Sequence, residues 1–327
     1  MSLINTKKTA LFLAVGAIPP TAPAGFIETS EPVLIVPEFA QIDINRISGK
    51  LNTKTSTTDT CRTKTSFDVN HIMRTSDKAA TALATPPEYG LLLKASGFLE
   101  SIDTTTPGEE TVTYENGTQS VPNTSAVAYL DGQKFTLTDS LASGSTINLK
   151  VGEPATIVNN FTGYMDDPIP VAEANPTVTL TEEVPLIVSC ADIILFDGTC
   201  LPVDNAVIKM NEELQDVYSL GGACGIKSAF VSDYALELAV DFYVDKAAFG
   251  REALNIQSGD MKEIIIKIAL DKTSTEVNGK SVVFTMDLAK TTTYSDSVDK
   301  DLLKRNTVFR LMDGSSPALS IKTGFFA

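Results

Sequence analysis

The chain has 327 residues, with 41 acidic and 26 basic side chains and a formal net charge of −15. Hydrophobic residues make up 43%, which is enough for a sizeable core and excludes a largely disordered chain. Because DNA and RNA phosphates are bound mainly by lysine and arginine, a chain this acidic is a poor candidate for tight nucleic-acid binding.

Two interpretations of the first residues stay open. Lys7 and Lys8 precede an apolar run that ends at Ile18, and Ala22-Pro23-Ala24 follows, which imitates a secretory signal and its cleavage site. The prolines at 19 and 20 are unusual in such a signal and favour an early strand followed by a proline-rich arm. No run of about 18 apolar residues exists, so we expect no transmembrane helix and no membrane partner.

Most of the next segments predict β structure. Residues 41–47 alternate strictly between apolar and polar, as a half-buried strand does. Residues 86–97 predict one short helix, with prolines at its start and a glycine at its end. Residues 101–121 are polar and contain two turn signals, so we expect a projecting loop or ribbon. Asp131-Gly132 predicts a tight hairpin turn.

The second half has a similar plan. Three prolines between 166 and 176 predict a linker, because proline is excluded from central strands. Residues 234–242 form the clearest amphipathic strand, residues 249–257 are a short helix candidate, and residues 263–270 and 282–288 are further strands around a turn at 278–279. The repeated order of strands, helix and hairpin predicts a duplication: one β domain over 1–165, a linker over 166–176 and a second β domain over 177–327.

No motif for catalysis, cofactor binding or metal binding stands out. The single histidine, His71, excludes a site with several histidine ligands, and we expect it to be an exposed or half-buried strand residue. The cysteines at 61, 190, 200 and 224 form no CxxC pair, so we expect reduced, mostly buried thiols; a Cys190–Cys200 disulfide is the alternative. We therefore expect no enzyme and no cofactor.

The order of these features resembles the major tail tube protein of long-tailed bacteriophages, in its larger form. The segments that carry the resemblance are Asn5-Thr6-Lys7-Lys8-Thr9-Ala10-Leu11-Phe12, residues 85–98, Tyr129-Leu130-Asp131-Gly132, Gly144-Ser145-Thr146-Ile147-Asn148-Leu149, Gly152-Glu153-Pro154-Ala155 and Asn160-Phe161-Thr162-Gly163-Tyr164. Ser96 stands where members of that family often have cysteine.

The resemblance implies a mainly β fold of tandem tail-tube-like β-sandwich or barrel domains, each with a short flanking helix. Chains would associate into rings, as trimers with pseudo-sixfold symmetry or as hexamers, and the rings would stack into a tube. Its partners would be other copies of itself, tail tip and terminator proteins, the tape measure protein in the lumen, and phage DNA that passes without specific binding. The protein would be made in the bacterial cytoplasm and end in the virion tail. The alternative is a secreted or surface β-rich module, such as a pilin-like domain, with a cleaved signal.

The acidity suggests a role for polar strand positions. A lumen rich in carboxylates would repel DNA phosphates near the wall, whereas a basic lumen would hold DNA. The candidate lumen-facing residues are polar alternates of the predicted strands: Asp43, Asn45, Asp68, Asn70, Glu237 and Asp241. The other interpretation is that these are ordinary solvent-facing positions. The arm at 19–32 and the loop at 101–121 are candidates for contacts between rings.

Overall fold

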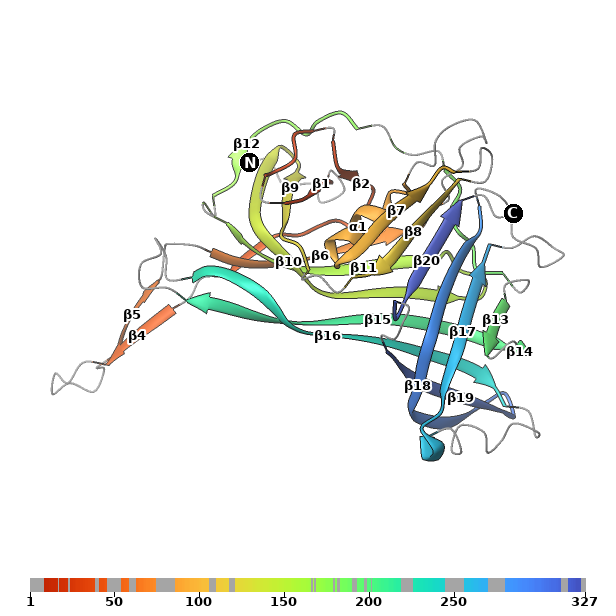
Figure 1. The fold of residues 1–327 in the computed structure, drawn as a ribbon. Coiled ribbons are helices and arrows are strands. Elements are labelled where there is room, and N and C mark those ends of the chain that lie inside the picture. Colours follow the sequence, from red (N-terminus) through yellow and green to blue (C-terminus); the bar gives the residue numbers. More distant parts are fainter. Residues whose placement is uncertain are drawn as a thin grey trace.

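In the computed structural model the chain is mainly β, as the sequence predicts, and most of its strands belong to one large antiparallel sheet (Figure 1). The residues that the structure describes are 9–16, 18–22, 24–38, 41–45, 54–58, 63–74, 86–105, 110–117, 121–165, 167, 169–178, 180, 183–189, 193–196, 199–200, 202–218, 226–244, 256–269, 280–312 and 317–324.

The strands of the first 172 residues are β1 (Thr9–Val15), β2 (Phe26–Ile27), β3 (Val36–Glu38), β4 (Gln41–Asn45), β5 (Lys54–Thr58), β6 (Thr63–Ile72), β7 (Phe98–Asp103), β8 (Thr111–Asn116), β9 (Thr124–Leu130), β10 (Gln133–Lys150), β11 (Thr156–Met165) and β12 (Val171–Ala172). Those that follow are β13 (Ile193–Phe196), β14 (Thr199–Cys200), β15 (Val203–Tyr218), β16 (Ile226–Tyr243), β17 (Met261–Ile268), β18 (Val282–Asp299), β19 (Leu302–Leu311) and β20 (Ser320–Gly324). Helix α1 is Tyr89–Ala95, and residues 256–258 are also helical.

The main sheet runs, from edge to edge, through β3, β6, β11, β10, β15, β16, β19, β18, β20, β8 and β7. A branch leaves β18 through β17 to β13 and β14. Among the described strands this ladder does not close on itself. Because every pairing is antiparallel, one face of the sheet can pack on the core while the other meets water.

The sheet crosses the predicted linker. β10 pairs with β15 over six residues, from Ser145↔Met210 to Lys150↔Asn205, and β8 pairs with β20 near the end of the chain. Backbone hydrogen bonds therefore join residues from before position 166 to residues from after position 176. The division into domains at 165 and 177 stays a prediction.

Strand β10 belongs to two layers at once. Its first part pairs with β9, which pairs with β1, whereas its second part pairs with β15. The change occurs at a register irregularity between Leu137 and Ser140, where Asp139 has a φ of 54°. Such a bulge bends a strand and increases its twist, so one strand passes from the upper layer of Figure 1 into the large lower sheet.

The predicted Asp-Gly hairpin is confirmed. Asp131 and Gly132 connect β9 to β10 with φ values of 46° and 83°. Positive φ at both central residues defines the tight turn that matches strand twist, and Asp-Gly is one of the sequences that adopts it readily.

The predicted short helix is confirmed as α1, with two prolines before it and Gly97, at a φ of 88°, after it. Its end is fixed on the sheet by Asn159 of β11, whose Nδ2 lies 3.2 Å from the Leu92 carbonyl oxygen, 2.8 Å from Ser96 Oγ and 2.9 Å from Ser145 Oγ. All of these groups are buried, so the hydrogen bonds hold α1 against the core face of β10 and β11.

Strand β1 is buried on both faces, which explains its continuous apolar sequence. Leu11 and Leu13 belong to the main core, while Phe12 packs with Tyr129 in a second cluster beneath Val178. The strand predicted at the start of the chain is thus a core strand that pairs with β9 at seven positions.

Five expectations need correction or fall wholly or partly outside the described residues. Residues 101–103 and 111–116 belong to a ribbon, the hairpin of β7 and β8, as one of the two predicted forms has it, but this ribbon pairs with β20 in the main sheet and does not project. His71 is 1% exposed, because its side of β6 faces the core. Of the helix predicted at 249–257, the described residues confirm only its end, since Gly259 follows with a φ of 71°. The turn at 278–279 and all four cysteine side chains lie outside the description.

Candidate functional site

Several of the candidate lumen residues lie on one face of the main sheet, the face that points away from the core. One row of directly paired residues crosses seven strands, and each of its members is exposed or half-buried. In order, the row is Asn70, Val158, Thr146, Lys209, Glu237, Arg310 and Lys290. We call this face, with the neighbouring rows on the same side, the outward face.

Four of the six candidate residues lie on the outward face. Asn70 and Glu237 belong to the same row. Asp68 is two residues from Asn70 along β6, and Asp241 is four residues from Glu237 along β16, so side-chain alternation places each on that face. Asp43 and Asn45 lie on β4, but their side chains are outside the described residues.

The charges on this face are mixed. Glu237 is paired directly with Lys209 on one side and Arg310 on the other, and Lys290 follows Arg310. The sequence interpretation concentrated on acidic positions and missed these three cations, although Lys209 occupies a polar position of an alternating strand. The row through Glu237 is therefore not an acidic stripe.

Asp241 is the carboxylate of this face with the best-defined partners. Asn306 Nδ2 donates to its Oδ1 at 2.7 Å, and Asn205 Nδ2 donates to its Oδ2 at 3.3 Å. Both asparagines are its direct cross-strand neighbours. Two neutral amides hold this carboxylate in place, and its charge also attracts Lys304.

The β4–β5 hairpin is a separate structural feature. Its strands pair from Gln41↔Thr58 to Asn45↔Lys54 and, among the described strands, with no others. Figure 1 shows it extending away from the body. A lone two-stranded ribbon is only marginally stable in water, so this hairpin is a candidate contact with another chain.

The predicted linker is bound to the body. We call the described residues between 169 and 188 the strap. Glu173 accepts hydrogen bonds from Tyr129 Oη at 2.9 Å and Lys134 Nζ at 3.0 Å. Asn175 Oδ1 accepts one from the Gly132 amide at 2.8 Å. These contacts fasten the strap across the turn between β9 and β10.

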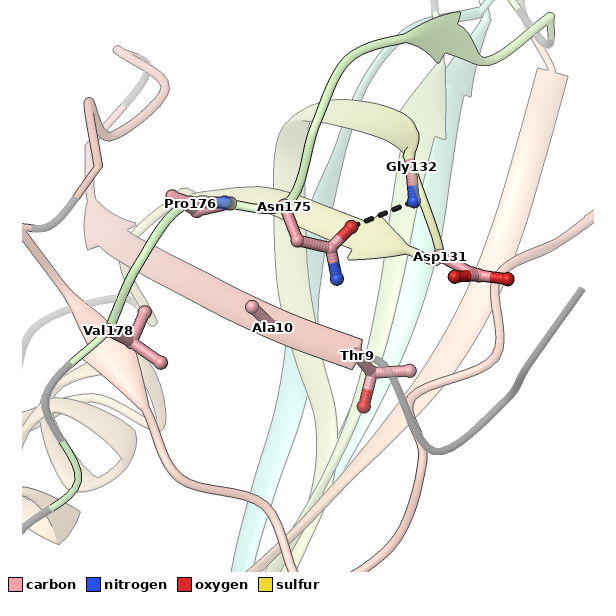
Figure 2. Close-up of a pocket in the computed structure, with 7 residues that line it drawn as sticks. All are labelled: Thr9, Ala10, Asp131, Gly132, Asn175, Pro176 and Val178. Carbon is pink, nitrogen blue, oxygen red and sulfur yellow. Dashed lines mark hydrogen bonds between the residues drawn. The ribbon is translucent and has the colours of Figure 1, made fainter.

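A shallow pocket of about 430 Å³ lies where the strap crosses the hairpin turn (Figure 2). It is lined by Thr9, Ala10, Asp131, Gly132, Asn175, Pro176 and Val178. The Asn175 amide already accepts the Gly132 hydrogen bond within it, and the lining contains no pair of acid and base groups. The lining residues fasten the strap, and their arrangement shows no further evident chemistry.

A partly buried ionic cluster lies at the end of β6. Arg74 donates to Glu28 Oε1 at 2.6 Å and to the Glu183 carbonyl oxygen at 3.0 Å. Glu88 accepts a hydrogen bond from the Glu28 amide, and burial raises the pKa of Glu88 to about 7. His71 Nδ1 lies 2.7 Å from the Glu28 carbonyl oxygen, which assigns the imidazole proton to Nδ1.

Burial also lowers the pKa of His71, so the imidazole is neutral near neutral pH. None of the pockets described at the strap, at Lys94 or at Glu31 is lined by members of this cluster. The sequence interpretation missed the cluster, because its members come from four separate segments and only their three-dimensional arrangement brings them together.

Within the described part of the chain, no group of three or more histidine, cysteine or acidic residues is arranged to hold a metal ion. No described helix has the length and apolar character needed to cross a membrane. A scan against models of protein families gives no match to this chain, and neither does a search of curated proteins.

Proposed function

We propose that this protein is a structural subunit of a phage tail tube, which assembles into stacked rings around a channel for DNA and has no catalytic role. The observation that carries the proposal is the outward face, a polar surface that crosses seven strands. A broad water-facing sheet surface suits the lining of an aqueous channel better than a dry protein contact.

Ring formation would also use the open edges of the sheet. Among the described strands, β3 and β7 each pair on one side only. Unpaired strand edges are aggregation hazards on a monomer, and pairing between neighbouring subunits removes them. A repeated contact between different surfaces gives a ring when its rotation closes. The finer fold proposed with this function is a pair of tail-tube-like sandwich or barrel domains, which would give three chains per ring.

The position of β1 supports this proposal over the secreted-module alternative. Cleavage of a signal ending near Ala24 would remove a strand whose central residues are at most 2% exposed at Leu11, Phe12 and Leu13. The mass of the N-terminal peptide of the native protein discriminates between the two. Cleavage after Ala24 would favour secretion, and retention of β1 would favour the tube.

Electron microscopy of the purified protein at high concentration tests assembly directly. We expect rings or hollow tubes, and the number of chains per ring tests the duplication. A sharper test uses Ser56→Pro in β5, since proline removes a hydrogen-bond donor and fits poorly within a strand. Its control is Ser56→Ala. We expect S56P to abolish tubes while the thermal unfolding temperature stays within a few degrees of that of S56A; tubes from S56P would exclude the hairpin as an assembly contact.

The proposal that carboxylates in the lumen repel DNA can be tested at two positions, Asp241 and Glu237. Asp241→Lys replaces a carboxylate that two asparagines hold and that attracts one cation, Lys304, whereas Glu237 lies between two cations, Lys209 and Arg310. If this face lines the channel and carboxylates reduce DNA adhesion, D241K slows DNA ejection from assembled particles more than Glu237→Lys does. Equal ejection rates for D241K and the unmodified protein, in normal tubes, would contradict the repulsion mechanism.

A further inference from the structure

The partly buried cluster at the end of β6 joins segments that are distant in the sequence. Glu28 follows β2, Arg74 follows β6, Glu88 precedes α1, and Glu183 lies on the strap. Arg74 is the shared partner, because its guanidinium contacts both the Glu28 carboxylate and the Glu183 backbone. The cluster therefore connects the N-terminal segment and the strap to the end of β6.

Both attached segments rely on this region for their hydrogen bonds. The Ser30 amide donates to the Asn70 carbonyl oxygen at 2.8 Å, and the Glu28 amide donates to Glu88. On the strap, the Leu186 amide donates to the Met73 carbonyl oxygen at 2.9 Å, and the Ala155 amide donates to that of Leu186 at 2.7 Å. A change in the cluster would thus be felt by both segments.

The cluster contains more carboxylates than cations. The charged groups that face Glu88 are Glu28, Arg74 and Glu183, and the neutral His71 adds no positive charge. The described contacts of Arg74 go to Glu28 and Glu183 and not to Glu88. An ionised Glu88 is therefore a partly buried charge beside two other carboxylates, which is unfavourable.

One buried atom indicates how protonation of Glu88 would affect the cluster. Glu28 Oε2 is buried and has no hydrogen-bond partner in the structure. Buried acceptors without partners are costly, and a protonated carboxyl group is a donor. Protonation of Glu88 removes a charge and adds a donor to a cluster with an unsatisfied acceptor.

We propose that Glu88 is a proton-controlled latch, which holds residues 26–30 and the strap at 183–188 on the end of β6 when its carboxyl group is protonated and loosens them when it ionises. This inference does not rest on the tail tube proposal, because it concerns contacts within one chain. The raised pKa of Glu88, about 7 against an ordinary 4.5, places the transition near neutral pH.

The direction of the pH dependence follows from the difference between the folded and unfolded pKa values of Glu88. The folded pKa lies above the unfolded one, so the stabilisation is fully present below pH 4.5 and is lost as the pH rises through about 7. Acidic conditions therefore close the latch, and mildly alkaline conditions loosen it.

Hydrogen–deuterium exchange of the full chain at about pH 6 and about pH 8.5, corrected for the intrinsic rate at each pH, tests the latch. We expect peptides that cover 26–30 and 183–188 to lose roughly tenfold in protection at the higher pH. Peptides from 206–210, in the centre of the sheet, serve as the internal reference and should change little. Unchanged protection of both segments would overturn the proposal.

Two variants distinguish control by Glu88 from a general loss of stability at the higher pH. Glu88→Gln keeps an acceptor for the Glu28 amide and cannot ionise, so its segments should stay protected at both pH values. Glu183→Gln removes a like charge that raises the pKa of Glu88, so loosening should begin at a lower pH, by roughly half a unit. If E88Q lost protection with pH as the unmodified protein does, or if E183Q left the midpoint unchanged, Glu88 would not be the controlling group.

Discussion

Glu212 shows how one buried side chain can set the pH dependence of stability. It lies on the core side of β15 with 7% exposure, and neither of its carboxylate oxygens has a hydrogen-bond partner. Burial raises its pKa to about 8. Because the folded pKa is above the ordinary value of 4.5, its neutral form is stabilising at low pH, and that contribution is lost as the pH rises through about 8.

Glu212→Gln should therefore already increase the free energy of unfolding at about pH 6, where only the unfolded glutamate is ionised, and increase it by about 1–3 kcal/mol more at about pH 9. Urea denaturation at the two pH values measures both effects. Glu213→Gln, on the exposed side of the same strand, is the matched control and should show no such difference. An equal gain for E212Q at both pH values would contradict ionisation as the cause.

Gly163 shows a steric requirement that the alternating pattern conceals. A Cβ atom at this position of β11 would lie 2.1 Å from Ser140 Oγ on the neighbouring strand. Gly163→Ala should destabilise the protein by about 1–3 kcal/mol through overpacking. Ser140 Oγ is buried without a partner, so Ser140→Ala alone should be nearly neutral.

The double variant G163A/S140A should recover most of the loss, because it removes the atom that the new methyl group would meet. Thermal unfolding of the four proteins gives the coupling energy. Additive effects of the two substitutions would show that Gly163 is needed for some other reason.

At the scale of elements, the β18–β19 hairpin contains an ion pair near its turn. Arg305, 1% exposed, donates from Nε and a terminal nitrogen to the two oxygens of Asp296, at 2.6 and 2.8 Å. Its guanidinium carbon lies 4.6 Å from the centre of the Tyr294 ring. The pair joins directly opposite residues, so it fixes the register of a ribbon whose far end is exposed.

Asp296→Asn should destabilise the protein by about 1–3 kcal/mol, because a neutral amide replaces the carboxylate that accepts two hydrogen bonds from the buried Arg305 guanidinium. Asp299→Asn in the same hairpin is the control, with an expected loss of about 1 kcal/mol or less. Arg305 lowers the pKa of Asp296 below 3.8, so the pair persists from neutral pH down to that value and is lost only as the pH falls further. Equal unfolding temperatures for D296N and D299N would show that the pair is not stabilising.

Elements with one buried face could be predicted from the sequence. The alternation over 234–242 places Leu236, Leu238, Val240 and Phe242 in the core. The Asp-Gly turn and α1 could also be predicted from the sequence. β18 was found only to residue 288, because seven consecutive residues after Thr291 are exposed and a strand without a buried face shows no alternation.

The partners of each strand were not predictable. A period of two tells which side chains share a face but not which strand lies alongside, so the β10–β15 and β8–β20 pairings could not be foreseen. The lack of pairing information also explains why the candidate site was only partly predictable. Alternation indicates which side of its strand Asn70 or Glu237 occupies, but the cations beside Glu237 become its neighbours only through strand pairing. The Glu28–Arg74–Glu88 cluster left no local signal in the sequence.

At the scale of the whole molecule, the strap is one of several connections between the two halves of the chain. The β10–β15 and β8–β20 pairings hold them together independently of it. A specific protease site inserted after the exposed Leu180 should therefore yield, after cleavage, two fragments that elute together in size-exclusion chromatography and separate only in denaturant. Separation without denaturant would show that the halves are self-sufficient domains.

The partnership of β8 with β20 has a consequence for the protein during its synthesis. Residues 111–115 leave the ribosome long before residues 320–324, with which they pair. At roughly 5–20 residues per second, the delay is on the order of 10–40 seconds. Throughout that interval one side of β8 has no native neighbour, and an incomplete chain carries an open strand edge in a crowded cell. Translation that stalls before residue 320 would therefore release aggregation-prone products with an open β8 edge, whereas a chain that includes β20 covers that edge itself.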